Sequence, residues 1–345
     1  MSGTTQSSTT RSGKTRTGTT RSRVLAALRD TEGYLSGQEL CERLQISRTA
    51  VWKAVQKLSD DGYRIEAVQN KGYRLLSLPE TLSAEELESR LKTRWLGKKV
   101  YAYDTVDSTN NRAKQLAMDG AENGAVVLSE IQTAGKGRRG RSWCSPPGSG
   151  IWMSLILKPK FMPECAPMLT LVMAHSVAMG IREATGLEAG IKWPNDVVVN
   201  RKKVCGILTE MSAEVDYIHH IVIGCGINVN IGGFPDEIAQ TATSLQIEAG
   251  RTFSRAAVAE HVLNWFEKDY EIFLKDLDLS GLKDIYNELL VGKDGMVRVM
   301  EPKGEYSGIS RGIDERGELL VEKEDKTLQK VYAGEVSVRG VYGYI

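Results

Sequence analysis

The sequence predicts an α+β protein of several domains: a small helical N-terminal domain, a larger mixed α/β domain and a C-terminal domain of short strands. Its 345 residues leave room for two or three domains, and its hydrophobic fraction of 41% is enough to form a core. Two closely spaced helix starts lie before residue 60. Strand-like apolar runs and long amphipathic helices follow, and short strands separated by turns occupy the segment after Lys293.

The charge of the chain is unevenly distributed. The net charge is +1, but the first 75 residues carry thirteen Lys and Arg against seven Asp and Glu, and the remainder carries 32 against 37. A basic N-terminal part on a mildly acidic body is typical of a nucleic-acid-binding module fused to another domain. A basic disordered tail is the alternative explanation. Residues 1–20, which are rich in Ser, Thr and Gly, are predicted to form such a tail.

The N-terminal domain is expected to contain a helix-turn-helix. From Arg21 onward, apolar residues recur at helical spacing. Ser36 and Glu39 have the spacing of a capping box, and Ser47 can cap the next helix. These signals predict helices over residues 37–44 and 48–59 with a three-residue turn between them, which is the spacing of a helix-turn-helix.

A β-hairpin after these helices makes the prediction a winged helix over residues 21–78. Two short strands, 65–68 and 73–76, are joined by the turn-forming residues 69–72. The second helix presents a polar face suited to a DNA groove. The predicted DNA-binding residues are this face and one residue of the hairpin turn: Arg48, Thr49, Trp52, Lys53, Gln56 and Lys71. A helical packing domain with no role in DNA binding remains the alternative.

Several classes of protein are disfavoured. The five cysteines include no Cys-x-x-Cys pair, which argues against a disulfide framework. The four histidines show no metal-ligand spacing with the cysteines, so no structural zinc is expected. No signal-peptide pattern and no apolar run of membrane-spanning length stand out. A cytoplasmic protein without a membrane partner is the expectation.

The rest of the chain divides into a linker, a central domain and a C-terminal domain. Residues 79–98 are predicted to form a charged helical linker, and residues 99–290 the α/β domain. Its expected strands are 100–103, 125–131, 151–157, 190–193, 197–199, 204–211 and 220–230. Its expected helices are 112–118, 167–185 and 254–274. Residues 291–345 are expected to form a small β-barrel with strands 297–300, 306–311, 318–322, 328–333 and 335–339.

A glycine-rich cationic loop follows the second strand of the central domain. The stretch GKGRRGRSW, residues 135–143, holds three glycines and four cations. Glycines let backbone N–H groups approach a ligand, and the cations favour an anion. The loop lacks the spacing of a P-loop. A solvated turn is the alternative.

Four more polar segments accompany this loop, and each also has a plain structural explanation. Residues 107–111 can cap a helix, 192–196 form a tight corner, 201–208 can form a cationic hairpin, and 224–228 end a strand. The glycines of the last segment allow close approach to the backbone.

Taken in order, these segments resemble the biotin protein ligase family. The matching stretches are STN (108–110), EIQTAGKGRRGRSW (130–143), KWPNDV (192–197), KKVCGIL (202–208) and GCGIN (224–228). With the winged helix in front, the chain is similar to the bifunctional biotin ligases that also repress the biotin operon. The resemblance covers residues 21–345, including the run Gly308–Ile313. It implies a class II synthetase-like central domain and an SH3-like C-terminal barrel. Lys136 stands where the family usually has arginine. The lysine keeps the positive charge but lacks the bidentate hydrogen-bonding fork of a guanidinium group.

The resemblance implies a reaction in two steps. The carboxylate of biotin attacks the α-phosphate of MgATP and gives biotinyl-5′-AMP and pyrophosphate. A lysine of an acceptor, the biotin carboxyl carrier protein, then attacks the mixed anhydride. The resemblance also implies homodimerisation on binding the adenylate and repression at operator DNA.

The same resemblance implies roles for individual residues. Lys203 and Arg138 would be catalytic. The biotin-binding residues would be Ser108, Thr109, Asn110, Gln132, Lys136, Gly137, Arg138, Trp143, Lys203 and Gly206. The nucleotide-binding residues would be Arg138, Arg139, Arg141, Asn195, Asp196, Asn228 and Arg339, with Mg²⁺ accompanying ATP near Asp196. The cationic loop would close over the adenylate and exclude water.

Two other functions are alternatives to that of a biotin protein ligase. A lipoate or octanoyl ligase would share the fold class, although the pairing of GKGRRGRSW with KWPND favours biotin. A non-catalytic, biotin-sensing transcription factor would bind biotin without adenylating it, and the presence of Lys203 and Arg138 argues against it.

Overall fold

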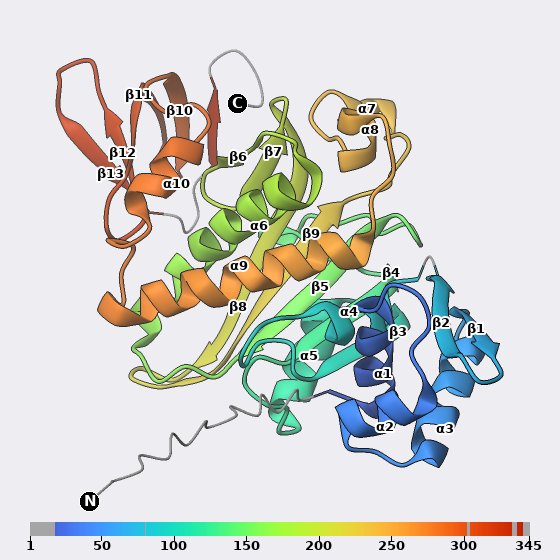
Figure 1. The fold of residues 1–345 in the computed structure, drawn as a ribbon. Coiled ribbons are helices and arrows are strands. Elements are labelled where there is room, and N and C mark those ends of the chain that lie inside the picture. Colours follow the sequence, from blue (N-terminus) through green and yellow to red (C-terminus); the bar gives the residue numbers. More distant parts are fainter. Residues whose placement is uncertain (1–17, 80, 302–303, 333–336, 341–345) are drawn as a thin grey trace, which may run out of the picture.

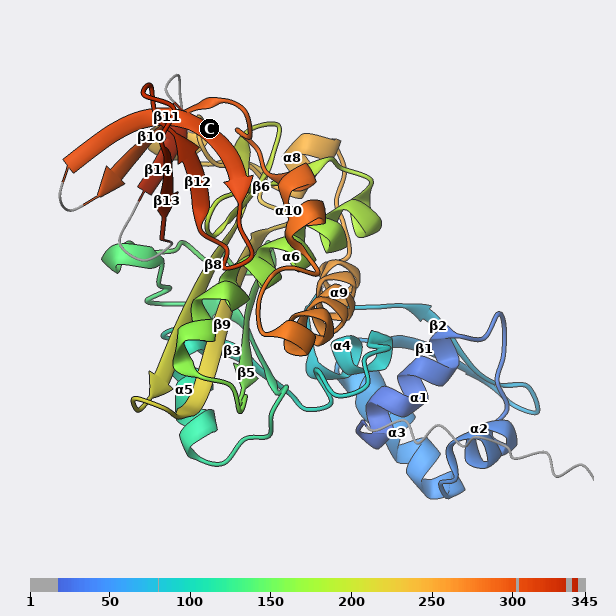
Figure 2. The same ribbon diagram turned by 90° about the vertical axis from the view of Figure 1, so that its left-hand side faces the viewer.

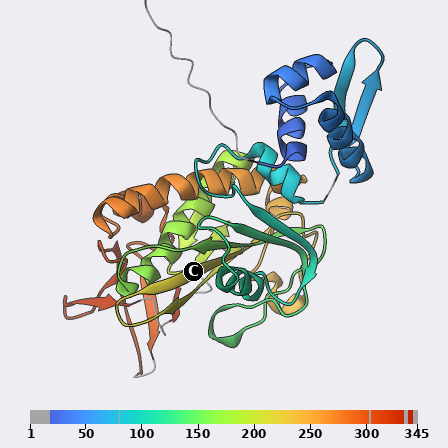
Figure 3. The ribbon, with the colours of Figure 1, turned by 90° about the horizontal axis from the view of Figure 1, so that it is seen from below.

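The three predicted parts of the chain follow one another in space. The computed structural model describes residues 18–79, 81–301, 304–332 and 337–340, so most of the predicted tail lies outside the described residues. Figure 1 shows the N-terminal domain (blue) at one end of the central sheet and the C-terminal strands (orange to red) at the other. The turned views in Figures 2 and 3 agree that the N-terminal domain projects from the body.

The N-terminal domain is a winged helix, as predicted. It consists of α1 (Thr20–Arg29), α2 (Gly37–Leu44), α3 (Arg48–Asp60), β1 (Arg64–Val68) and β2 (Gly72–Ser77). The capping box forms: Glu39 N donates to Ser36 Oγ at 3.1 Å, and Ser36 N donates to Glu39 Oε2 at 2.9 Å. Leu25, Leu40 and Leu58 are fully buried between the helices. Local capping signals therefore set the boundaries, and the apolar stripes set the packing.

The linker helix is shorter than predicted. The helix α4 covers Ala84–Arg90, and the chain then turns toward the central sheet. The carboxylate of Glu267 in the middle of α9 accepts the backbone N–H groups of Arg94, Trp95 and Leu96 at 2.5, 2.9 and 3.0 Å. A tertiary contact with a residue far along the chain therefore replaces the helical hydrogen bonds that local sequence predicted.

The central domain is built on one seven-stranded sheet. Its order is β3-β4-β5-β9-β8-β7-β6, in which β3 and β4 are parallel and every other pair is antiparallel. The strands are β3 (Val100–Val106), β4 (Val126–Gln132), β5 (Gly150–Leu157), β6 (Ala189–Lys192), β7 (Asp196–Val199), β8 (Lys202–Ala213) and β9 (Ile218–Asn228). All seven predicted strands are present, and β3 is longer than expected.

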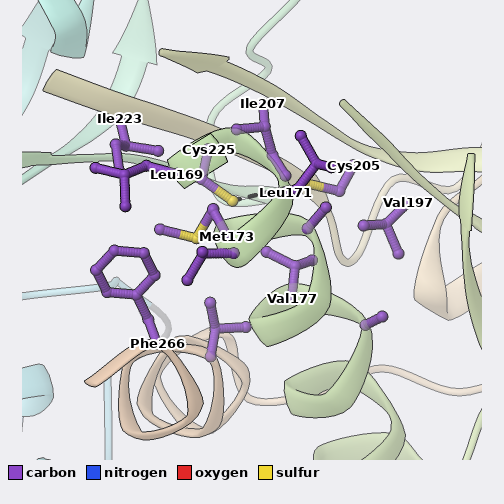
Figure 4. Packing of buried hydrophobic residues seen from close by; sticks show 14 of the residues in the cluster. Leu169, Leu171, Met173, Val177, Val197, Cys205, Ile207, Ile223, Cys225 and Phe266 are labelled. Carbon is purple, nitrogen blue, oxygen red and sulfur yellow. Dashed lines mark hydrogen bonds between the residues drawn. The ribbon is translucent and has the colours of Figure 1, made fainter. Parts of the chain in front are cut away.

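Helices cover both faces of this sheet. One face packs against α6 (Leu169–Thr185) and α9 (Arg255–Asp276), and the other packs against α5 (Thr109–Met118). Alternation along the strands separates the faces, so Val126 and Leu128 join the main core and Val127 joins the α5 side. Figure 4 shows Leu169 and Met173 of α6 packed among Cys205 and Cys225 of the sheet.

One core segment has the length and composition of a membrane span. The apolar run Pro163–Thr185, a 3-10 turn continued by α6, has 23 residues, and 72% of its most apolar window is buried inside the protein. This run was not expected from the sequence. The burial is that of a core helix covered by the sheet and α9.

The C-terminal domain is a five-stranded antiparallel sheet of order β13-β12-β11-β10-β14. Its strands are β10 (Met296–Glu301), β11 (Gly304–Ile313), β12 (Leu319–Glu322), β13 (Leu328–Val331) and β14 (Ser337–Gly340). Residues 335 and 336 of the last predicted strand lie outside the described residues. Trp193 Nε1 donates to Gly317 O at 3.0 Å and joins this sheet to the central domain. Three short helices were not predicted: α7 (Asp236–Ala239), α8 (Leu245–Ala249) and α10 (Lys283–Leu289).

Replacing Glu267 should loosen the linker. We expect Glu267→Ala to lower the free energy of unfolding of the central domain by about 2–4 kcal/mol, because three backbone N–H groups lose their acceptor. Hydrogen exchange at the amides of residues 94–96 should accelerate with it, and urea unfolding gives the stability. The matched control is Glu271→Ala. Glu271 lies on the same helix as Glu267, and its more exposed carboxylate pairs with the side chain of Arg94. Equal effects of the two substitutions would contradict this account.

Candidate active site

The glycine-rich loop folds back on itself as a small hairpin. Trp143 N donates to Gly135 O at 2.8 Å, and Gly137 N donates to Arg141 O at 2.7 Å. The tip is a 3-10 turn in which Arg139 adopts a left-handed conformation with φ of 59°. A Cβ at Gly135 would lie 2.4 Å from Trp143 O, so glycine is needed where the two arms meet.

Three glycines on neighbouring strands leave a bare patch on the sheet. Gly206 of β8 pairs with Gly226 of β9, and Gly224 lies two residues before it. A Cβ at Gly206 or Gly226 would lie 2.8 or 2.7 Å from the indole ring of Trp143. A Cβ at Gly224 would lie 2.2 Å from Asn110 Oδ1. The patch therefore admits the Trp143 ring from the loop and the Asn110 amide from α5.

A small inner cavity lies over this patch. Its free volume is about 50 Å³, and it reaches from the start of α5 to the base of the loop. Ser108 stands at the N-cap position of α5 but its side chain makes no capping hydrogen bond, contrary to the capping role expected of this segment. Thr109 donates its backbone N–H and its hydroxyl to Gln132 Oε1 at 2.9 and 3.1 Å. One side of the cavity wall therefore contains polar groups that orient one another by hydrogen bonds.

A larger, cationic cleft of about 400 Å³ opens beside the inner cavity. Arg138 Nη1 donates to Asn195 Oδ1 at 2.7 Å, and Lys203 Nζ lies 2.6 Å from Asp196 Oδ1. The same ammonium group lies 5.2 Å from the centre of the Trp143 ring. Lys203 and Arg138 line both hollows, so they stand where the two meet.

Burial changes the electrostatics of this junction. Desolvation lowers the pKa of the Arg138 guanidinium below its ordinary value, and neighbouring Asp196 opposes that shift. An anion that enters the cleft would compensate the lost hydration of the guanidinium. The arrangement is therefore suited to bringing two anionic groups together between Lys203 and Arg138.

The structure brings nearly all predicted site residues together. The inner cavity is lined by Ser108, Thr109, Asn110, Gln132, Lys136, Gly137, Arg138, Trp143, Lys203 and Gly206. The outer cleft is lined by Arg138, Arg139, Arg141, Asn195, Asp196 and Asn228. Arg339 lies on β14, and its side chain is outside the described part of the chain.

Some residues of the site were not predicted from the sequence. The individual roles of Gly224 and Gly226 were not identified, although the Gly-Cys-Gly pattern was a usable signal for a bare strand. Nor were Ser154, Glu210 and the cleft-lining segment around Phe234 predicted. Ser154 and Glu210 carry no local signal, because they meet Asn110 through pairing of distant strands.

The predicted DNA-binding face is exposed. Arg48, Thr49, Trp52, Lys53 and Gln56 of α3 are all exposed, as is Lys71 in the β1–β2 turn. A groove of about 540 Å³ separates α3 from the hairpin, and Arg48, Trp52 and Lys71 line it. Trp52 leaves 54% of its surface accessible, although an apolar ring of this size is usually buried.

Comparison with known proteins gives consistent matches along the chain. Residues 102–228 match the Biotin/lipoate A/B protein ligase family, residues 20–74 an HTH domain and residues 296–339 the Biotin protein ligase C terminal domain. The chain is 41% identical over 307 residues to the bifunctional ligase/repressor BirA of Bacillus subtilis, covering 88% of this chain and 94% of that protein. The corresponding Escherichia coli protein is 30% identical, with coverage of 92% and 96%.

A solved structure agrees with these matches. The biotin protein ligase from Aquifex aeolicus, in complex with biotin and ATP, superposes with a TM-score of 0.64 at 30% identity. The match covers 70% of this chain and 99% of that one.

Filling the bare patch should release the loop. We expect Gly226→Ala to expel the Trp143 ring, because the new Cβ would overlap it. Trypsin should then cut faster after Lys136, Arg138, Arg139 and Arg141, as followed by mass spectrometry. The control is Gly232→Ala, since a Cβ there would have no heavy atom within 4 Å. Cutting rates that are the same for both variants would show that Trp143 does not hold the loop.

Proposed function

The chain belongs to the biotin protein ligase family, and on this premise we propose that it activates biotin with ATP, attaches it to a lysine of an acceptor protein and represses transcription through its winged helix. One observation carries the catalytic part of the proposal. A small inner cavity with polar side chains in its wall and a larger cationic cleft meet at Lys203 and Arg138. This is the geometry needed to join a carboxylate to a phosphate.

Biotin occupies the inner cavity and ATP the outer cleft. The groups around Ser108, Thr109 and Gln132 bind the ring system of biotin, helped by Asn110 and by backbone groups of Lys136, Gly137 and Gly206. Trp143 packs against the apolar body of the ligand. Arg139, Arg141, Asn195 and Asp196 bind the nucleotide and Asn228 lies near its adenine, while Arg339 reaches the nucleotide from the C-terminal domain. The proposed biotin-binding residues all line the inner cavity, and the proposed nucleotide-binding residues other than Arg339 all line the outer cleft, which supports this assignment.

The first half-reaction is an attack by one anion on another. The biotin carboxylate attacks the α-phosphate, a bond to phosphorus forms, and pyrophosphate leaves. Lys203 bridges the carboxylate and a phosphate oxygen, and in doing so exchanges its contact with Asp196 for the ligand. Arg138 holds the phosphate. Positioning and charge compensation supply most of the acceleration in a step of this kind.

The second half-reaction is acyl transfer from the anhydride. The amine of the acceptor lysine attacks the biotinyl carbonyl carbon, an amide forms, and AMP leaves. Water would compete as a nucleophile, so the loop 135–143 must stay closed over the adenylate. The backbone hydrogen bonds within the loop and the packing of Trp143 against Gly206 and Gly226 support a closed position of the loop. The acceptor is proposed to be a biotin carboxyl carrier protein.

Magnesium accompanies ATP in this proposal. The cleft offers Asp196, which fits the usual pattern of one or two carboxylates plus the substrate phosphates. The ion would neutralise phosphate charge.

A cytoplasmic location is also proposed and agrees with five free cysteines. The domain limits near residues 20, 78, 98 and 290 are also part of the proposal, and the separate core of the N-terminal domain supports the first two.

Repression requires two copies of the winged helix, because one recognition helix reads a single half-site. We propose that binding of biotinyl-5′-AMP promotes homodimerisation and thereby operator binding. The exposed face of α3 and the groove beside it support a DNA contact.

Adenylation should depend on Lys203. We expect biotin-dependent exchange between pyrophosphate and ATP in the wild type, and a loss of at least about 100-fold in Lys203→Ala, because the attacking carboxylate loses its counter-charge. The matched control is Lys202→Ala, the preceding residue, which lines neither hollow. Lipoate and octanoate are tested as alternative substrates, each in place of biotin. Exchange with either of them in place of biotin would favour the lipoate or octanoyl ligase alternative.

Dimerisation should respond to the adenylate. Sedimentation of the wild-type chain is expected to show a tighter dimer with biotinyl-5′-AMP than without it. Lys203→Ala with biotin and ATP should stay at the ligand-free value, because it cannot make the adenylate. A dimerisation constant that does not change with biotinyl-5′-AMP would remove the basis for ligand-dependent repression.

A further inference from the structure

A buried polar network lies behind the inner cavity, and the mechanism above does not use its far end. The network runs from Gln132 through Thr109 and Ser154 to Asn110, and then to Glu210 on β8. Ser154 is fully buried, and Asn110 is 4% exposed. Glu210 lies on the far side of Asn110 and does not line the cavity.

The hydrogen bonds of Asn110 fix which way its amide faces. Asn110 Nδ2 donates to Glu210 Oε2 at 2.7 Å and to Leu208 O at 3.2 Å. Both amide hydrogens are thereby used by acceptors that cannot donate. A flipped amide would place Asn110 Oδ1 against these two oxygens, which is strongly unfavourable in a buried site.

With the amide held this way, the carbonyl oxygen points away from Glu210 and Leu208 O, and Asn110 itself lines the inner cavity. Asn110 Oδ1 lies over Gly224, one of the three glycines of the bare patch. It accepts from Ser154 Oγ at 2.7 Å, but the same hydroxyl also lies 2.8 Å from Thr109 Oγ1. A hydroxyl has one hydrogen and a carbonyl oxygen has two lone pairs, so Asn110 Oδ1 retains capacity for a donor from a ligand.

Glu210 is held as a carboxylate. Burial raises the pKa of Glu210, but hydrogen bonds from Lys114 and Asn110 outweigh it and bring the pKa below the ordinary value. Lys114 on α5 forms an ion pair with the other carboxylate oxygen. A hydrogen bond to a charged acceptor is shorter and stronger than one to a neutral acceptor, so the amide has little freedom to turn.

We propose that Glu210 is a positioning residue that sets substrate choice, because it locks the orientation of the Asn110 amide and so selects ligands that present an N–H group to its carbonyl oxygen. The ureido ring of biotin has such a donor, whereas the dithiolane of lipoate and the alkyl chain of octanoate have none. A ligand without the donor would leave the second acceptor position of this buried oxygen unfilled, which disfavours an analogue that lacks the N–H group. This inference rests on the proposed binding of biotin in the inner cavity.

Binding measured without ATP tests the idea apart from catalysis. By calorimetry on the full chain, we expect Glu210→Leu to weaken biotin about tenfold, because Asn110 loses the acceptor that orients it. Glu210→Gln keeps an acceptor oxygen and should stay within about threefold of the wild type. The Michaelis constant for ATP should change less than about twofold in both variants. Lipoate binding should not change, so the preference for biotin over lipoate falls by the same tenfold.

A matched control uses the same β8–β9 hairpin. Glu214→Leu removes a largely exposed carboxylate near the tip and should leave biotin binding as in the wild type. If Glu210→Leu unfolds, Glu210→Ser carries the same expectation, because serine is too short to reach Asn110. Equal weakening by the Gln and Leu variants, equal losses for biotin and lipoate, or unchanged biotin binding in Glu210→Leu would each overturn the inference. A wild-type chain that binds no biotin would instead overturn the proposed function.

Discussion

The close approach of the Trp143 ring and the Asn110 amide to the bare backbone of β8 and β9 is the contact on which the site depends. Any side chain at Gly206, Gly224 or Gly226 would occupy the space that these two groups fill. Trp143 holds one end of the cationic loop, and Asn110 holds the start of α5. Because both use the same patch, the loop and the cavity wall are placed relative to one another by a single stretch of backbone.

The charged side chains that line the outer cleft add an electrostatic preference to this geometry. The described lining of the outer cleft contains five cations, Arg138, Arg139, Arg141, Lys192 and Lys203, and one carboxylate, Asp196. Such an excess favours polyphosphate. The contact between Lys203 and Asp196 keeps the ammonium at the junction of the two hollows. A ligand carboxylate can then replace Asp196 with little movement of the lysine, which is the kind of preorganisation that electrostatic catalysis requires.

Local signals predicted the parts of the fold that local interactions determine. The boundaries of α2 and α3 follow from serine caps whose hydrogen bonds lie within three residues, and the sequence analysis located them within one residue. The linker helix was overextended because Glu267, more than 170 residues away along the chain, binds the backbone of residues 94–96. The site residues were grouped through motif resemblance. The partners of Asn110 could not be found that way, because strand pairing alone brings Glu210 to it.

A half-buried carboxylate connects the linker after the winged helix with the backbone that follows the cationic loop. Glu130, two residues before Gln132, accepts from Leu82 N in the linker at 2.8 Å and from Gly148 N after the loop at 3.1 Å. It also receives two hydrogen bonds from Arg255, which is 5% exposed. Moving either backbone segment away removes one hydrogen bond from this half-buried carboxylate, and the ion pair with Arg255 does not replace it. Leu82 in the linker and Gly148, five residues after the loop, are therefore constrained together, because both donate to the one carboxylate of Glu130.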